Sequence, residues 1–308
     1  PASKKLKGTA HVLCLSFISG GIEMDIKSLF GYAGKTVVVS GGYSGMGYAA
    51  VRLLIDLGAD VYVICRKNGR HSKMDLPVKG EFYADFGAKS DLDALSKNLP
   101  DQISALFLCH GIALNSDGSN ALEVQRVNFL GHKYLLENIS TKISDCGSVN
   151  IIGSTGGFDW QSNVKSCLEV VKADSYESAI EWYEQHPEEI ASGYVFSKQC
   201  LCTYVKANVH APMFIDRKIR LNMINPGNTL TGLTDDFNRG TSPSGNAEEG
   251  KSVIESLFLE SWNGYWASPE DMGYPLVAIG SSLFSYMSGQ IIYLDYGVSS
   301  VWEFESLA

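Results

Sequence analysis

Short apolar runs alternate with longer stretches of helical periodicity from residue 35 to the end of the chain. Seven runs rich in β-branched residues predict strands at 36–40, 61–65, 81–84, 105–109, 149–152, 220–224 and 290–294. Between the first two, apolar residues recur at helical spacing over 45–57, and Gly58 ends the helix. This alternation predicts a doubly wound α/β fold, in which helices cover both faces of a seven-stranded parallel sheet.

Two stretches interrupt the alternation without dividing the chain. Residues 161–190 contain an acidic and aromatic segment at 175–185, with Pro187 soon after, which predicts a pair of helices inserted over the sheet. Residues 227–265 are rich in Gly, Ser and Asn, which predicts a flexible substrate lid. No linker or repeat separates these stretches from the rest, so we predict one domain over residues 31–308.

Residues 1–30 match no part of this pattern. Lys4, Lys5 and Lys7 precede an apolar run at 12–18 that is similar to a short signal-peptide core, but no clear cleavage site follows. The run is too short to span a bilayer. We therefore expect a peripheral N-terminal extension, no membrane span and a cytoplasmic protein.

Composition excludes several classes of function. The chain is 45% hydrophobic and 19% charged, which is ordinary for a globular protein. Its formal net charge of -9 disfavours a nucleic-acid partner, because that binding depends on basic residues that neutralise phosphates. Its seven cysteines show neither CxxC nor Cys/His zinc spacing, so we expect no disulfide framework and no metal.

A glycine-rich turn at residues 40–47 follows the first predicted strand and opens into a helix. Glycines allow the backbone to approach a pyrophosphate, and the helix N-terminus supplies N–H donors, so the turn predicts a dinucleotide site. The second strand ends in Cys65, Arg66 and Lys67, where an acid would favour NAD and a base favours a 2′-phosphate. NADP(H) is therefore preferred, with NAD(H) and a merely solvated basic loop as alternatives.

Tyr194 and Lys198 lie four positions apart, which places them on one face of a helix. A lysine ammonium near a phenol favours the phenolate, so we expect a lowered pKa that suits acid–base chemistry. Such a pair is common by itself. Its significance comes from Ser154, which follows the fifth predicted strand, and Asn128, although Ser154 could be a turn residue and Asn128 could bond to the backbone inside a helix.

Taken together, these motifs resemble the short-chain dehydrogenase/reductase family, which has a Rossmann-type fold, from about residue 35 to residue 297. The resemblance implies that Tyr194 donates or accepts the proton, Ser154 holds the substrate oxygen, Lys198 binds the nicotinamide ribose and Asn128 holds a relay water. It also implies that Thr229 and Thr231 bind the nicotinamide carboxamide. The residues expected to contact the cofactor, from motif and resemblance together, are Ser40, Gly41, Tyr43, Ser44, Gly45, Met46, Gly47, Cys65, Arg66, Lys67, Asp85, Phe86, Cys109, His110, Gly111, Tyr194, Lys198, Pro226, Gly227, Thr229 and Thr231.

Two of these residues leave an alternative open. Asp85, after the third predicted strand, is placed to meet the adenine amino group, with a capping role as the alternative. His110 stands where the family has a small residue, and we favour a packed core histidine over a cofactor contact or a polar group at the site.

The insertion before Tyr194 gives a closer resemblance to the bacterial 3α-hydroxysteroid dehydrogenase/carbonyl reductase group. We accordingly predict an NADP(H)-dependent oxidoreductase that interconverts a ketone and a secondary alcohol on an apolar steroid or bile acid. The alternatives are a carbonyl reductase for smaller ketones or aryl alcohols and a catalytically silent dinucleotide-sensing protein. The resemblance also implies a homodimer or a higher homo-oligomer.

Residues expected to line an apolar substrate pocket come from the lid and from the loop after Ser154. They are Leu230, Leu233, Phe237, Leu257, Phe258, Trp262, Tyr265, Trp266, Phe158 and Trp160. The alternative is that the same residues form the core of the lid.

Overall fold

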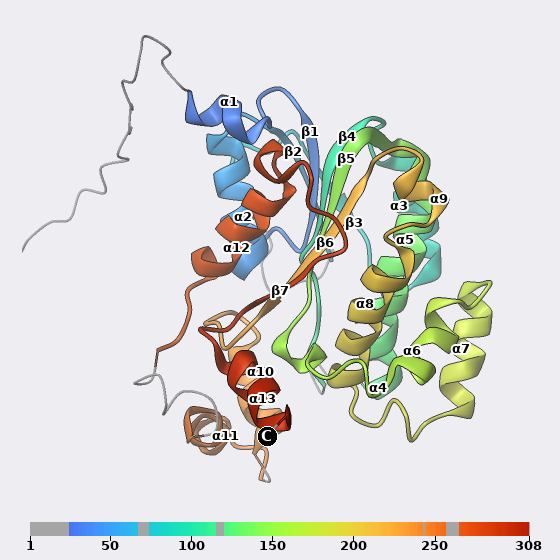
Figure 1. Ribbon diagram of the computed structural model, residues 1–308, viewed down its shortest axis with the longest axis vertical. Coiled ribbons are helices and arrows are strands. Elements are labelled where there is room, and N and C mark those ends of the chain that lie inside the picture. Colours follow the sequence, from blue (N-terminus) through green and yellow to red (C-terminus); the bar gives the residue numbers. More distant parts are fainter. Residues whose placement is uncertain (1–24, 67–73, 115–119, 243, 257–264, 308) are drawn as a thin grey trace, which may run out of the picture.

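A single parallel sheet forms the centre of the molecule in the computed structural model, which describes residues 25–66, 74–114, 120–242, 244–256 and 265–307 (Figure 1). Its seven strands follow the order β3-β2-β1-β4-β5-β6-β7, which confirms the predicted doubly wound Rossmann-type fold. The strands are β1 (Thr36–Ser40), β2 (Asp60–Cys65), β3 (Gly80–Tyr83), β4 (Ile103–Leu108), β5 (Ile143–Ile152), β6 (Arg220–Pro226) and β7 (Ile291–Leu294).

The central strands are apolar because both of their faces are covered. Val37, Val38 and Val39 of β1 are fully buried, as expected for a parallel strand between two helical layers. In β1, Val37 pairs with Val61 of β2 and with Ala105 of β4, so the three strands run in register. Their carboxyl ends therefore meet at one edge of the sheet.

Helices cover the two faces as separate layers (Figure 1). One layer contains α2 (Gly45–Asp56) and α12 (Pro269–Gly280), which pack on one face of the sheet. The opposite layer contains α3 (Lys89–Asn98), α5 (Gly131–Ile139) and α8 (Tyr194–Asn208). The remaining helices are α1 (Ile26–Phe30), α4 (Ala121–Gln125), α6 (Val164–Val171), α7 (Tyr176–Gln185), α9 (Pro212–Ile215), α10 (Thr234–Thr241), α11 (Ala247–Ile254) and α13 (Val298–Leu307).

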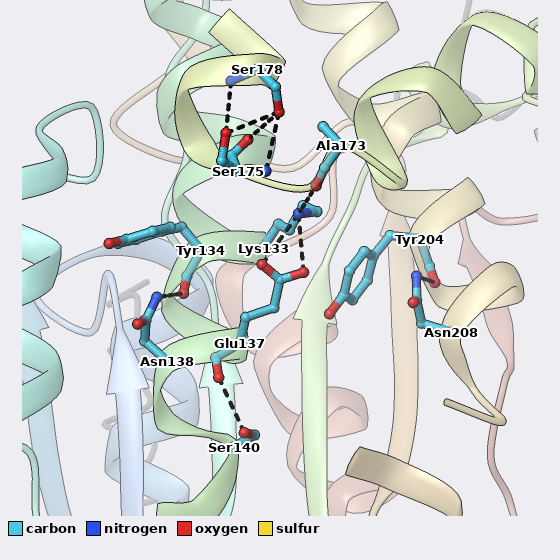
Figure 2. A network of polar contacts seen from close by, with 10 residues as sticks. All are labelled: Lys133, Tyr134, Glu137, Asn138, Ser140, Ala173, Ser175, Ser178, Tyr204 and Asn208. Atoms are coloured by element: carbon cyan, nitrogen blue, oxygen red, sulfur yellow. Dashed lines mark hydrogen bonds and ion pairs between the residues drawn. The ribbon is translucent and has the colours of Figure 1, made fainter. Parts of the chain in front are cut away.

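The predicted helical insertion consists of α6 and α7. Ser175 begins α7 with a reciprocal cap, in which its hydroxyl accepts from the Ser178 backbone and the Ser178 hydroxyl accepts from the Ser175 backbone. Figure 2 shows how the insertion is attached to α5: Lys133 donates to the Ala173 carbonyl at 3.0 Å and pairs with Glu137 at 3.0 Å. Lys133 is buried, so this contact fixes the turn between α6 and α7 against α5.

The expected lid is more ordered than a loop of its composition predicts, because it holds α10 and α11. The Asn246 side chain begins α11 by accepting from the backbone N–H groups of Glu248 and Glu249. Gly250 lies so close to α10 that an added Cβ would be 1.6 Å from the Asn238 carbonyl oxygen. The two helices therefore pack directly on each other within the part of 227–265 that the structure describes.

Part of the N-terminal extension, residues 1–24, lies outside the described residues, and α1 follows it. Within the described ranges, no helix combines the length and the apolar character that crossing a membrane requires.

Candidate active site

The glycine turn after β1 has a backbone that side chains would block. Gly41 has a φ of +68°, and a Cβ there would lie 2.8 Å from the backbone nitrogen of His110. A Cβ on Gly47 would lie 2.3 Å from the Gly41 carbonyl oxygen. The turn leads into α2, whose N-terminal N–H groups suit an anion. These restrictions fit the cradle that a dinucleotide pyrophosphate requires.

A cavity of about 610 Å³ extends from this turn along the carboxyl edge of the sheet to Tyr194. Its volume falls within the range of cofactor and ligand sites. The expected cofactor residues that line it are Gly41, Tyr43, Ser44, Gly45, Met46, Gly47, Cys65, Arg66, Asp85, Phe86, Cys109, His110, Gly111, Tyr194, Lys198, Pro226, Gly227, Thr229 and Thr231.

Two expected site residues do not line the cavity, and a third cannot be placed. Ser40 is fully buried, and its hydroxyl lies 2.7 Å from His110 Nδ1 and accepts from the Cys109 backbone. It therefore supports the cavity wall from behind. Asn128 is also fully buried, and Lys67 lies outside the described residues.

Tyr194 begins α8 and lies beside Ser154, which follows β5. Its ring packs edge-on against Phe237 of α10, with 4.8 Å between the ring centres. Burial raises the pKa of Tyr194 to about 12, although a hydrogen bond with the Ser154 side chain acts to lower it. The expectation of a lowered pKa was therefore wrong, because removing the phenolate from water outweighs the stabilisation that its neighbours provide.

Ser154 lies between β5 and Tyr194. Its Oγ accepts from the Gly156 backbone at 3.0 Å, and its backbone N–H donates to Asn225 Oδ1 at 3.1 Å. Ser154 is therefore a turn residue, as the alternative expected, and it also lines the cavity, so its role toward the substrate oxygen stays a prediction. With a backbone donor already on its oxygen, the serine O–H can donate to a substrate.

Lys198 follows Tyr194 by one helical turn, as its spacing predicts. Its Nζ lies 5.4 Å from the centre of the Tyr194 ring and donates to the Ile152 carbonyl at 3.4 Å. Burial lowers the pKa of Lys198 to about 8. The ammonium is therefore poised to lose its proton just above neutral pH.

Asn128 lies in a π-helical turn, Arg126–Leu130, between α4 and α5. Its Oδ1 accepts from the Ile112 N–H at 2.8 Å, and its Nδ2 donates to the Ile112 carbonyl at 2.9 Å and to Ser197 Oγ at 3.3 Å. Single π-helical turns of this kind are frequent at functional sites. Asn128 thus bonds to backbone, as the alternative expected, and joins α8 to the loop after β4.

An acid that the sequence did not reveal lies beside Tyr43 and Cys65, two residues that line the cavity. Glu81 of β3 accepts hydrogen bonds from the hydroxyls of Tyr43 and Tyr83, and its charge acts to raise the pKa of Cys65. Parallel pairing of β2 with β3 brings it there, since Val63 is opposite Glu81. Arg66 is exposed and lines the cavity at the same end.

Asp85 and His110 both lie in the cavity wall, and contact of either residue with the cofactor stays a prediction. Asp85 does not cap α3, which begins after Ala88 without a side-chain cap. Asp85 lines the cavity, and its carboxylate also accepts from the Gly87 N–H at 2.8 Å in the turn before α3. The His110 ring stacks on His132 with 3.9 Å between centres and also lines the cavity. Burial, His132 and Lys198 lower the pKa of His110, so this residue is a neutral packed histidine in the cavity wall.

The apolar residues expected around the substrate are only partly brought together. Leu233, Phe237 and Trp266 line the main cavity. Phe158 and Trp160 do not line it, which corrects the expectation: Phe158 packs on Tyr293 and Trp302, and Trp160 packs on the core. Leu230 is exposed, Tyr265 lines a second cavity, and Leu257, Phe258 and Trp262 lie outside the described residues.

Comparisons with known proteins identify relatives of this chain in fold and in sequence. No family model matches the chain. A curated relative, coniferyl-alcohol dehydrogenase of Pseudomonas sp. (strain HR199), is 26% identical over 203 residues, which are 66% of this chain and 76% of the relative. The solved 3-alpha-hydroxysteroid dehydrogenase of Pseudomonas sp. B-0831, complexed with NADH, has a TM-score of 0.70 at 20% identity and covers 88% of this chain and 99% of its own. A short chain dehydrogenase family protein of Francisella tularensis has a TM-score of 0.65 at 20% identity and covers 87% of this chain and 100% of its own.

Proposed function

We propose that this oxidoreductase, which has the fold of the short-chain dehydrogenase/reductases and a curated dehydrogenase among its relatives in sequence, interconverts an apolar alcohol and its carbonyl compound through Tyr194. One observation carries the proposal. Tyr194, Ser154 and Lys198 converge at one end of a cavity whose other end is a glycine cradle of the kind that binds a dinucleotide.

The side chains have distinct tasks in the reductive direction. A bound nicotinamide cofactor supplies the hydride. Tyr194 gives its proton to the carbonyl oxygen, and Ser154 donates a hydrogen bond to the same atom, which stabilises the charge that develops there. Lys198, one turn behind the phenol, supplies a positive charge and a proton to restore Tyr194. Asn128 keeps α8 in place through Ser197 and, by the family resemblance, would hold the relay water.

NADP(H) is the preferred cofactor in this proposal. Arg66 lies at the 2′ end of the cavity and Cys65 stands where an acid would favour NAD(H). Glu81 is the opposing influence, because a carboxylate near this end suits a free 2′-hydroxyl. NAD(H) therefore remains the alternative, and the structural relative complexed with NADH is an example of this fold with that cofactor.

Two substrate classes are supported by different observations. The helical insertion and the structural likeness to a 3-alpha-hydroxysteroid dehydrogenase support a 3α-hydroxysteroid or bile acid. The sequence relationship to a coniferyl-alcohol dehydrogenase supports an aryl alcohol. Both are apolar, as the Phe237 and Trp266 walls require.

The proposal is tested by measuring NADPH and NADH oxidation against steroids with 3-, 7-, 12-, 17- and 20-keto groups, alongside small aryl ketones and aryl aldehydes. We expect turnover of at least one class. NADPH binding without turnover of any compound would instead support the catalytically silent sensor.

The family resemblance also supports a homodimer, which light scattering would test.

The cysteines, without disulfide spacing in the sequence, support a cytoplasmic location.

A further inference from the structure

A second cavity of about 320 Å³ lies between α12, the end of β7 and α13. We call it the aromatic slot. Its lining residues are Thr155, Gly227, Asn228, Tyr265, Ala267, Asp271, Met272, Leu294, Asp295, Tyr296, Val298 and Trp302.

The aromatic slot adjoins the main cavity beside Ser154 and is lined by no residue of the glycine turn at 40–47. Thr155, Gly227 and Asn228 line both the slot and the main cavity. Thr155 directly follows Ser154, and Gly227 directly follows β6. A substituent of the reacting carbon that extends past Thr155 would therefore enter the slot.

Flat rings form much of its wall. Tyr265 and Tyr296 lie 5.6 Å apart between ring centres. The ring of Trp302 packs edge-on against the ring of Phe158, with 5.3 Å between ring centres. Phe158 does not line the main cavity but supports the wall of the slot. Met272, Leu294 and Val298 complete an apolar surface.

The two carboxylates of the slot are already engaged in holding backbone. Asp295 accepts from the N–H groups of Gly297 and Ser299 and so fixes the start of α13. Asp271 accepts from the Ser268 N–H and hydroxyl at the start of α12. The wall that remains for a ligand is therefore mainly aromatic and aliphatic.

We propose that the aromatic slot binds a flat aryl group carried on one side of the reacting carbon. This proposal rests on the function proposed above and chooses the aryl class within it. The reacting carbon of a ketone carries two substituents. Tyr194, Ser154 and Phe237 line the main cavity, and the slot adjoins that cavity at Thr155, the residue after Ser154, so one substituent can lie in each. Offset and edge-to-face packing against tyrosine and tryptophan favours a planar ring over a saturated one of similar size. A volume at the lower limit of ligand pockets fits one or two rings.

The arrangement also predicts stereochemistry. With the ring held in the slot, the carbonyl presents one face to the hydride, so acetophenone should give mainly one enantiomer of 1-phenylethanol.

The experiment compares acetophenone, cyclohexyl methyl ketone and 2-butanone as substrates, in the wild type and in variants of α13. Val298→Trp fills the slot, whereas Val301→Trp places the same side chain on an exposed position of the same helix. We expect Val298→Trp to lower kcat/KM for acetophenone at least ~10-fold relative to 2-butanone and to lower the enantiomeric excess, and Val301→Trp to change neither. Tyr296→Leu, at a more exposed position of the wall, gives a second variant, which should lose the preference for acetophenone over the cyclohexyl ketone.

The outcomes separate the slot from the proposed function. The slot would be overturned, and the proposed function would stand, if two ratios stayed at their wild-type values while acetophenone was turned over. These are kcat/KM for acetophenone relative to 2-butanone in Val298→Trp and relative to the cyclohexyl ketone in Tyr296→Leu. A wild type that reduces 2-butanone but not acetophenone would overturn the slot as well. A wild type that reduces no carbonyl compound would overturn the proposed function and the slot with it.

Discussion

Burial shifts the two ionisable groups at the reaction centre in opposite directions. It raises the pKa of Tyr194 to about 12 and lowers the pKa of Lys198 to about 8, because each charged form loses its hydration. Tyr194 is thus a protonated donor throughout the physiological range, which suits reduction. Lys198 is the group whose charge changes near neutral pH.

A pH dependence of reduction follows from Lys198. The ammonium is present below its pKa of about 8 and is lost above it, so kcat for ketone reduction should be steady near pH 6 to 7 and fall as the pH rises through about 8. The measurement is kcat against pH, with NADPH binding determined at each pH so that a loss of cofactor is not mistaken for a loss of proton transfer. A rate that stays level well above pH 9 would show that Lys198 does not supply the proton.

Arg66 should determine the choice of cofactor. Arg66→Ala removes the positive charge that faces a 2′-phosphate, and a hydrogen bond to a charged group contributes about 1.5–3 kcal/mol, so KM for NADPH should rise ~10-fold or more. KM for NADH should change little.

The matched variant for cofactor choice is Glu81→Gln, which removes the opposing carboxylate and should raise KM for NADH relative to NADPH. Equal effects of Arg66→Ala on both cofactors would contradict the assignment of Arg66 to the 2′ end.

The residues of the site differ in how far sequence could predict them. Tyr194, Ser154 and Lys198 were predictable because each has a fixed place relative to a strand end or a helical turn. Glu81 was not, since only the pairing of β2 with β3 brings it to Cys65 and Tyr43. Ser40 has the expected position in the motif, but its side chain is buried and forms hydrogen bonds with the Cys109 backbone and the His110 ring.

Among the elements, the inserted helices were predictable and the lid helices were not. Ser175 and the apolar residues after it form a regular helix start, which the sequence displays. The lid is rich in residues that break helices. Asn246 caps α11, and Gly250 lets α11 approach α10 closely. Neither role can be recognised from the sequence before the contact between the two helices is known.

Gly250 provides a test of the lid as an element of the substrate site. Gly250→Ala would place a Cβ 1.6 Å from the Asn238 carbonyl oxygen, so α11 must move away from α10. Phe237 and Ile254, from these two helices, both line the main cavity, so KM for the ketone should rise several-fold while NADPH binding is retained.

The matched control for the lid is Gly240→Ala, whose Cβ would meet nothing within 4 Å. It should leave KM unchanged. If both variants behaved like the wild type, the packing of α10 on α11 would not shape the substrate site.

At the scale of the whole molecule, the order of the strands explains why one edge carries the chemistry. The alternation of strands and helices predicts a parallel sheet whose carboxyl ends meet, and that edge is where the glycine cradle and Tyr194 face a single cavity. The aromatic slot could not be predicted in this way. Its walls come from Tyr265, Met272 and Trp302, on segments that only the folded chain brings beside Thr155.

The central claim is that Tyr194 transfers the proton, and Tyr194→Phe tests it most directly. The substitution keeps the ring and its packing on Phe237 but removes the hydroxyl. The account predicts that kcat for ketone reduction falls by a factor of about 10² to 10⁴, with NADPH affinity close to that of the wild type. Turnover near the wild-type rate in this variant would contradict it.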